Sequence, residues 1–218
     1  MQGSLSEEFP EHEDPWGHNR NGVTSNLNQE KTMAGLLNEI DIRRAYRALS
    51  GEKIPEDVVT RLMKAATYAP SCFNSQPWRF MVVTDEGSLE KLHGALSGGN
   101  YWAKKAPLLI VVATKLAFDA RLSDNRDYAL YGCGLAAENL LLQAFADGLY
   151  AHPMAGFDPL VVKEAFDIPE DYIVINLIAV GYPGSLDGLS EKHITAEGSE
   201  RSRKDETEVI CYNKWAFE

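Results

Sequence analysis

The sequence predicts an α+β protein, and three observations lead to this class. Its 218 residues are 44 % hydrophobic and 24 % charged, ordinary values for a folded domain that exclude wholesale disorder and collagen-like repeats. Helical patterns come first along the chain, and strand patterns follow, separated by helices of unequal length. No internal repeat is visible, so this order fits an α+β arrangement better than a regular series of βαβ units.

The first 32 residues differ in composition from the rest. They are acidic and polar with few apolar side chains, so they cannot build a core of their own. We therefore expect an acidic arm or leader over residues 1–32 and a folded domain with an extended C-terminal tail over residues 33–218. Met33 is an alternative start of the protein, and the sequence leaves that choice open.

Two helices are expected at the start of the folded domain. Apolar spacing predicts a short one over residues 36–42 and a longer one over residues 55–69. Pro55 and the two acidic residues after it favour the start of the second helix. Pro70 ends it, because the residue before a proline avoids the helical region. Residues 71–77 are expected to form an ordered loop.

The longest helix is expected over residues 126–149. It is apolar around most of its circumference, which predicts a central position, and Gly148 supplies its end. Gly132 and Gly134 would each cost about 1 kcal/mol relative to alanine inside a helix. Their presence indicates that another backbone or a flat ligand approaches closely there.

The other elements are short apolar strands and short helices. We expect strands at 80–83, 108–112 and 173–180, helices at 89–96 and 159–166, a loop at 153–156 and a strand-like piece at 209–212. The strand at 108–112 is apolar throughout, which is typical of a strand covered on both faces.

The net charge and the spacing of the cysteines limit the classes of function that the protein can have. The 21 basic and 32 acidic residues give a net charge of −11, which argues against non-specific binding to nucleic acid or anionic membrane. Cys72, Cys133 and Cys211 have neither zinc-ligand nor redox-motif spacing, which favours reduced thiols in a cytoplasmic protein. The longest apolar runs are too short to cross a bilayer as a helix.

Commoner catalytic machinery is not found in the sequence. It has no phosphate-binding loop, no G-x-G-x-x-G fingerprint after a strand and no G-x-S-x-G elbow. None of the five histidines stands at metal-ligand spacing, so we expect no metal site. A catalytic thiol at Cys72 has weak support, because no histidine is adjacent to it.

Two arginine clusters lie near opposite ends of the folded domain. Arg43, Arg44 and Arg47 form the first, and Arg201 and Arg203 belong to the second. Each cluster alone is most simply a solvated surface. Together, in a protein that is acidic overall, they suggest a shared phosphate site, because guanidinium groups bind phosphate oxygens in pairs and stay charged.

The most informative segment is Ala-Pro-Ser-Cys-Phe-Asn-Ser-Gln-Pro-Trp at residues 69–78. It follows Arg-Arg-Ala-Tyr-Arg at 43–47 and precedes Gly-Leu-Tyr-Ala-His-Pro-Met-Ala-Gly-Phe-Asp at 148–158 and a strand ending in Gly-Tyr-Pro at 181–183. In these motifs the chain resembles the FMN-dependent nitroreductase family, from about residue 33 to residue 218. The motif at 69–78 is highly specific, whereas the arginine clusters are not.

The resemblance implies the family's fold and cofactor. The fold would be a central, mostly antiparallel sheet flanked by helices, in an intertwined homodimer with two FMN sites at the subunit interface. Arg43, Arg44, Arg201 and Arg203 would hold the phosphate. Arg47 would reach the N1–C2 edge of the flavin, where reduction places negative charge.

The remaining cofactor contacts are also carried over from the family. The partner subunit would contribute Pro70, Ser71, Cys72 and Asn74. The segment Pro153, Met154, Ala155 and Gly156 would lie against the ring, with a backbone amide donating to N5, and Asn100 would contact the pyrimidine edge. Ala45 replaces a serine that is usual in the family, and Ala155 replaces a frequent acidic residue, which makes the substrate pocket less acidic.

Four other side chains have plainer interpretations. Trp78 and Tyr131 are expected in the core, Asn139 is expected to form an interhelical hydrogen bond, and His152 is expected at the surface or internally hydrogen-bonded.

The activity implied by the resemblance is transfer of a hydride from NADH or NADPH through flavin N5 to a nitroaromatic or quinone-like acceptor, with ping-pong kinetics. The alternatives are a flavin store or sensor without efficient turnover, or a family member with flavin-destructive or dehalogenase chemistry. The fold alone does not separate them.

Overall fold

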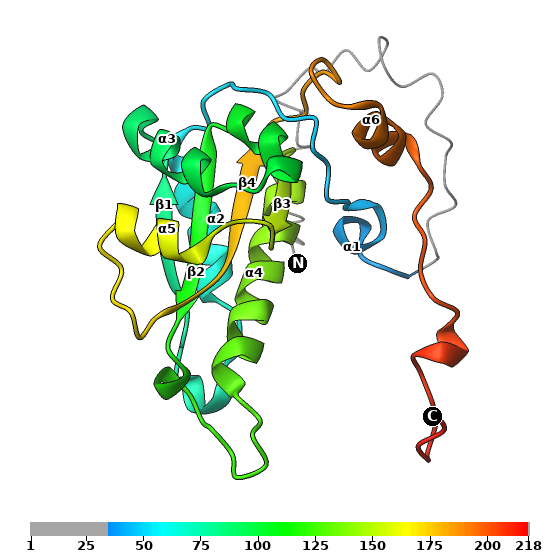
Figure 1. Cartoon of the computed structure of the whole chain (residues 1–218). Coiled ribbons are helices and arrows are strands. Elements are labelled where there is room, and N and C mark those ends of the chain that lie inside the picture. Colours follow the sequence, from blue (N-terminus) through cyan, green and yellow to red (C-terminus); the bar gives the residue numbers. More distant parts are fainter. Residues whose placement is uncertain (1–34, 218) are drawn as a thin grey trace, which may run out of the picture. The chain divides into compact units, whose positions relative to one another are not determined.

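A four-stranded antiparallel sheet is the centre of the fold (Figure 1). The computed structural model describes residues 35–217. Its strands are β1 (Arg79–Val83), β2 (Leu108–Thr114), β3 (Tyr150–Met154) and β4 (Ile173–Gly181), in the order β1-β2-β4-β3. Every pairing is antiparallel. The α+β class and the antiparallel sheet are therefore confirmed.

The helices confirm most of the expected elements. They are α1 (Asn38–Ile42), α2 (Glu56–Thr67), α3 (Glu86–Ala95), α4 (Tyr128–Ala146), α5 (Pro159–Ala165) and α6 (Glu191–Gly198). Short 3₁₀ turns lie at η1 (Cys72–Asn74), η2 (Gly98–Lys105), η3 (Leu116–Phe118) and η4 (Glu206–Glu208). Helix α6 has no counterpart among the expectations, because its residues are polar and no side chain in it is fully buried.

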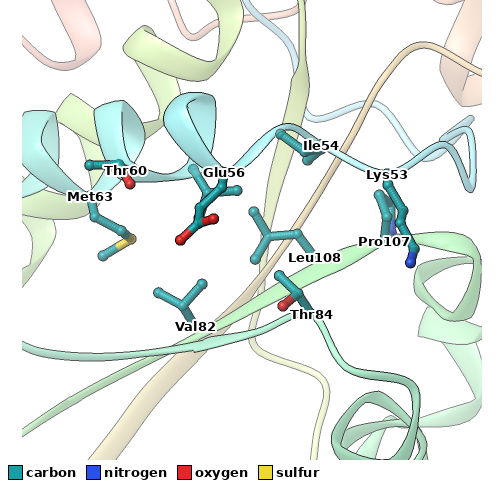
Figure 2. A pocket seen from close by; sticks show the side chains of 10 residues that line it. Lys53, Ile54, Glu56, Thr60, Met63, Val82, Thr84, Pro107 and Leu108 are labelled. Carbon is teal, nitrogen blue, oxygen red and sulfur yellow. The ribbon is translucent and has the colours of Figure 1, made fainter.

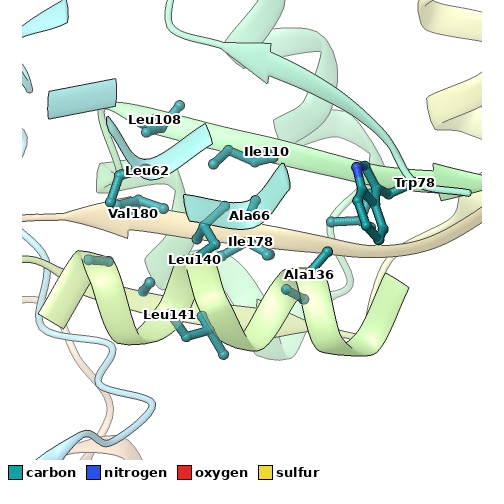
Figure 3. Packing of buried hydrophobic residues seen from close by; sticks show 14 of the residues in the cluster. Leu62, Ala66, Trp78, Leu108, Ile110, Ala136, Leu140, Leu141, Ile178 and Val180 are labelled. Atoms are coloured by element: carbon teal, nitrogen blue, oxygen red, sulfur yellow. The ribbon is translucent and has the colours of Figure 1, made fainter. Parts of the chain in front are cut away.

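Helices cover both faces of the sheet. Side chains alternate along each strand, so every strand contributes residues to both layers. Leu108, Ile110 and Val112 of β2 pack with α2 and α4 (Figure 3). Leu109 and Val111 face the other way, toward α3, η2 and α5. All seven residues of β2 are buried, which confirms the expectation of a strand covered on both faces.

Helix α4 packs closely against the loop before β1. A Cβ atom on Gly132 would lie 3.0 Å from Cγ of Pro77, so the close neighbour at this glycine is a proline side chain and not the backbone or flat ligand that was expected. Apart from the backbone of α4 itself and the two neighbours in the chain, no described atom lies within 4 Å of the corresponding position on Gly134. Asn139 donates to the carbonyl of Ala65 on α2 at 3.2 Å, as expected. Gly148 ends the helix with a φ of 74°.

Of the two residues expected in the core, one is buried and the other is exposed. Trp78 is buried and packs in the cluster between α2, α4 and the sheet (Figure 3). Tyr131 is 64 % exposed, so its assignment to the core is wrong for the described chain. It lies on a face of α4 that no other described element covers, together with exposed Leu130.

The expected loop at 153–156 is partly wrong. Pro153 and Met154 belong to β3, where they pair with Ile178 and Leu177 of β4. Proline removes a ladder donor and is tolerated here because β3 is an edge strand of this sheet. Only Ala155 and Gly156 fall in the connection to α5.

The tail after α6 also differs from its expectation. Residues 209–212 form no strand in the described chain, and Val209, Ile210 and Tyr212 are exposed. A strand needs a neighbour to pair with, and no described strand lies beside this segment.

The N-terminal arm expected over residues 1–32 lies outside the described residues. From Leu37 onward the chain forms one compact unit. None of the helices in the described part is both long and apolar enough to cross a membrane.

Candidate functional site

The segment that carries the first arginine cluster is anchored to the end of β4. The amide of Ser50 donates to the carbonyl of Tyr182, and the amide of Gly184 donates to that of Ala48, both at 2.8 Å. A Cβ atom on Gly184 would overlap the backbone of Leu49 and lie 2.6 Å from the amide nitrogen of Ser50. The lack of a side chain at Gly184 therefore lets this segment lie against the sheet.

The C-terminal tail runs beside the same segment. The Arg44 guanidinium donates to the carbonyl of Ser199 and, at 3.3 Å, to its hydroxyl. From the tail back to the first segment, Arg201 donates to the carbonyls of Arg43 at 2.7 Å and Ile40 at 3.2 Å. Side chain to backbone hydrogen bonds thus hold two segments together that are far apart in the sequence.

Between these two segments lies a pocket of about 260 Å³, which we call the arginine pocket. Its lining residues are Arg43, Arg44, Ala45, Glu200, Arg201, Ser202 and Arg203. Four guanidinium groups and one carboxylate leave it with a net positive charge. The structure therefore brings together four of the five arginines singled out in the sequence.

The guanidinium groups of the arginine pocket keep hydrogen-bonding capacity. A guanidinium has five N–H donors. Within the described residues Arg44 and Arg201 each use two of them and Arg203 uses one, on the carbonyl of Ser202. The buried Nε of Arg43 has no hydrogen-bond partner there and lies 3.4 Å from Oε1 of Glu138. Such a site can bind an anion with several acceptor oxygens.

Arg47 does not line the arginine pocket. Its guanidinium nitrogen lies 3.5 Å from Oε1 of Glu197, whose side chain is only 7 % exposed. The same carboxylate accepts from the amides of Arg47 at 3.0 Å and Ala48 at 3.3 Å. The sequence analysis did not identify Glu197, because no local pattern links it to Arg47.

The connection after β3 is held by a separate set of contacts. The carbonyl of Gly156 accepts from the amide of Ser97 at 3.0 Å and from the side-chain amide of Asn100 at 2.8 Å. A Cβ atom on Gly156 would lie 2.5 Å from Oγ of Ser97. Asn100 therefore positions the Ala155–Gly156 backbone in this structure, and Ala155 is exposed beside it.

His152 is internally hydrogen-bonded. Its Nδ1 lies 3.1 Å from the carbonyl oxygen of Tyr46, and its ring lies 4.5 Å from that of Trp102, centroid to centroid. Burial lowers the pKa of His152 to about 4, and the nearby Arg47 charge acts in the same direction. With this pKa the imidazole is neutral at pH 7.

The loop that carries Pro70, Ser71, Cys72 and Asn74 lies at the other end of the sheet. It leads into Arg79, which pairs with Ala113 near the end of β2, whereas the arginine segment meets the chain just after Gly181 of β4. The loop is ordered by the amide of Gln76, which donates to the Ser71 hydroxyl at 2.9 Å. One chain therefore does not bring this loop and the arginine pocket together.

Neither the Cys133 thiol nor the acidic groups of the described residues form a second reactive or metal-binding site. Burial raises the pKa of the Cys133 thiol to about 11, which keeps it protonated. Within residues 35–217 no group of three or more histidine, cysteine or acidic side chains could hold a metal ion. A cavity of about 600 Å³ lies between α2 and strands β1 and β2 (Figure 2), but the expected site residues do not line it.

The fold and the site define a class: an α+β protein with a positively charged, arginine-lined pocket at one end of an antiparallel sheet. A comparison with models of known protein families identifies the family. The chain belongs to the nitroreductase family, whose model matches residues 40–100 and 94–182. By class it is therefore an oxidoreductase.

Individual relatives agree with this assignment. A protein of Methanothermobacter thermautotrophicus, provisionally named NADH dehydrogenase/NAD(P)H nitroreductase, is 29 % identical over 186 residues, or 81 % of this chain and 92 % of that protein. The 5,6-dimethylbenzimidazole synthase of Rhodospirillum rubrum is 28 % identical over 168 residues, or 65 % of this chain and 78 % of that one. A solved structure described as an oxidoreductase containing FMN superposes with a TM-score of 0.71 at 26 % identity, covering 81 % of this chain and 90 % of that one.

Proposed function

We propose that this chain is an FMN-dependent oxidoreductase that passes a hydride from NADH or NADPH to an electron-poor acceptor, either nitroaromatic or quinone-like. The observation that carries the proposal is the arginine pocket, which is assembled from both ends of the folded domain. The solved relative that contains FMN and the relative named for NAD(P)H support the choice of cofactor and reductant.

The residues of the arginine pocket fit a phosphate monoester. Arg44, Arg201 and Arg203 each keep at least three N–H donors unused within the described residues, and Arg43, whose Nε lies 3.4 Å from the Glu138 carboxylate, adds its positive charge. A phosphate group would supply oxygen acceptors to the unused donors and negative charge to the pocket. The pocket would thus fix the phosphate end of FMN.

The other residues would hold and shield the flavin ring. FMN, when bound, supplies the two-electron redox chemistry that no side chain here can provide. The backbone at Ala155 and Gly156, which Ser97 and Asn100 hold in place, would contact the ring. Arg47 would lie at the edge of the ring where negative charge develops, with Glu197 as its partner. We assign no acid–base residue, since His152 is neutral at pH 7.

We further propose that the protein is a homodimer with each FMN site shared between two copies. The loop with Pro70, Ser71, Cys72 and Asn74 lies far along the sheet from the arginine pocket, so a second copy is needed to supply it. Exposed apolar side chains on α4 and in the tail, including Tyr131, Tyr212 and Trp215, are suited to burial against that copy.

Kinetics and location follow from the same proposal. A single slot beside the ring would take NAD(P)H and the acceptor in turn, which gives ping-pong kinetics. The three cysteines carry no disulfide among them, which suits the reducing cytoplasm.

The visible absorption spectrum of the purified protein tests the proposal. We expect a flavin spectrum after reconstitution with FMN, and bleaching when NADH or NADPH is added without oxygen. Oxidation of NAD(P)H should then depend on menadione or a nitrofuran. A protein that stays colourless and takes up no added FMN would contradict the proposal.

Two alternatives give different results in the same experiment. A flavin store or sensor would be yellow but would not be bleached by either nicotinamide. Flavin-destructive chemistry would show loss of the flavin spectrum without sustained turnover of NAD(P)H. Dehalogenase chemistry would release one halide for each NAD(P)H oxidised, and only when a halogenated substrate is present. The similarity to a relative that is named as a synthase is the reason to test for these other chemistries.

A further inference from the structure

Glu197, near the C-terminal end of α6, is a carboxylate with an unusual number of partners. Oε1 accepts from the amide of Arg47 at 3.0 Å and contacts the Arg47 guanidinium at 3.5 Å. Oε2 accepts from the amide of Ala48 at 3.3 Å. The side chain is 7 % exposed, so these contacts replace most of its water.

The chain segment that Glu197 holds has no helix or strand of its own. Residues 43–48 have no regular secondary structure, so their amides need partners from elsewhere. A buried carboxylate is costly unless it is paired and hydrogen-bonded. Glu197 and this segment satisfy each other, because the carboxylate gains two amide donors and an ion pair, and the two amides gain an acceptor.

The contact lies directly beside the arginine pocket. Arg44 and Arg43 precede Arg47 on one segment, and Ser199 and Arg201 follow Glu197 on the other. The hydrogen bonds from Arg44 to Ser199 and from Arg201 to Arg43 continue the same contact along both segments. Glu197 is therefore the most buried of the contacts that join the two segments beside the pocket.

We propose that Glu197 is a positioning residue for the phosphate site: it sets the register of the two arginine-bearing segments and thereby the affinity for a phosphate monoester. The choice of FMN as that monoester rests on the proposed function. Glu197 itself does not line the arginine pocket, so its effect on phosphate binding is indirect.

The test compares FMN with riboflavin, which lacks the phosphate. Titration of the apoprotein by flavin fluorescence gives both dissociation constants, and their ratio isolates the phosphate contribution. Changes in ring binding or in overall folding affect both ligands and cancel. In Glu197→Gln we expect the preference for FMN over riboflavin to fall roughly ten- to hundredfold, as expected for lost hydrogen bonds to a charged group.

Glu191→Gln is the matched control. Glu191 is an exposed acid in the first turn of the same helix, so its substitution removes the same charge without touching the arginine segment. We expect its preference for FMN to match that of the wild type. Far-UV circular dichroism and thermal melts check that each variant is folded.

A second variant covers the case in which Glu197→Gln does not fold. Glu197→Asp keeps the charge but is one methylene shorter, so it cannot keep all three contacts, and the preference for FMN should again fall. An unchanged ratio in the folded variant overturns the inference and leaves the proposed function standing. Wild-type protein that binds neither flavin overturns both.

Discussion

At the scale of single residues, the arginine pocket makes the sharpest prediction. Arg203 has one hydrogen bond within the described residues, to the carbonyl of its neighbour Ser202, and its remaining donors face no protein acceptor there. We expect Arg203→Ala to weaken FMN binding by roughly 2–5 kcal/mol, because it removes one partner of the proposed charge pair with phosphate. Isothermal titration or flavin fluorescence measures the loss.

Arg61→Ala provides the comparison. Arg61 on α2 contacts Asp147 at 3.1 Å and Asp57 at 3.6 Å, away from the arginine pocket. Exposed ion pairs of this kind contribute about 1 kcal/mol or less to stability. FMN affinity should therefore stay close to that of the wild type. Equal FMN retention in Arg203→Ala and Arg61→Ala would remove the C-terminal tail from the site.

His152 gives a prediction about acid stability. The folded protein holds this imidazole neutral, with a pKa of about 4 against an ordinary value of 6.5. The unfolded chain takes up the proton first as the pH falls. The contribution of His152 is therefore complete above pH 6.5 and is lost between pH 6.5 and pH 4, by about 3 kcal/mol in total.

The measurement is urea unfolding at several pH values. The free energy of unfolding of the wild type should fall more steeply between pH 6.5 and 4 than that of His152→Gln, which cannot titrate. The difference between the two proteins isolates His152 from the carboxylates that titrate in the same range. Parallel curves would show that His152 does not hold its neutral form through burial.

The sequence predicts those site residues that stand in local motifs and misses those defined by contacts between distant segments. The arginines and the loop at 70–74 stand in recognisable strings, so they could be singled out before the structure was known. Glu197 could not, because its contact partner lies 150 positions away and a buried acid has no sequence pattern of its own. The contact of Asn100 with Gly156 was missed for the same reason.

At the scale of elements, periodicity located the helices and strands that have a strong apolar pattern. β2 and α4 are buried and apolar, and both were placed within a few residues. β3 was mistaken for a loop at Pro153, because only its position at the sheet edge makes a proline acceptable. Helix α6 has a polar surface, so it lacks the stripe from which helices are recognised.

The junction between β4 and the arginine segment can be tested at Gly184. Any side chain there overlaps the backbone of Leu49 and Ser50, which cannot move without breaking the hydrogen bond from Gly184 to Ala48. We expect Gly184→Ala to destabilise the protein by about 1–3 kcal/mol, as overpacking does, and to weaken FMN binding. Thermal unfolding and flavin titration measure the two effects.

Gly94→Ala is the control for the same chemical change. Gly94 lies in α3, and no described atom outside the backbone of that helix and the two chain neighbours lies within 4 Å of a Cβ placed on it. Alanine there should be neutral or should stabilise the helix by up to about 1 kcal/mol, with FMN affinity unchanged. If Gly184→Ala behaved like Gly94→Ala, the arginine segment would not depend on this close approach.

At the scale of the whole molecule, the two proposed cofactor-binding regions are too far apart for one chain to combine them into a site. The arginine pocket adjoins the end of β4, and the loop with Asn74 precedes β1 at the opposite end of the sheet. A homodimer of two-fold symmetry would place each loop against the pocket of the other copy. Each site would then need Arg203 from one chain and Asn74 from its partner.

Mixed dimers test this arrangement. Arg203→Ala should disable the pocket, and Asn74→Gly should disable the loop without straining its backbone, because Asn74 has a φ of 59° that glycine adopts freely. Each variant alone should bind little FMN. A heterodimer of the two, isolated through different affinity tags, carries one site with both defects and one site with none. We therefore expect FMN in about half of its sites. Heterodimers without FMN, or tagged chains that never purify together, would show that the site is not shared between two copies.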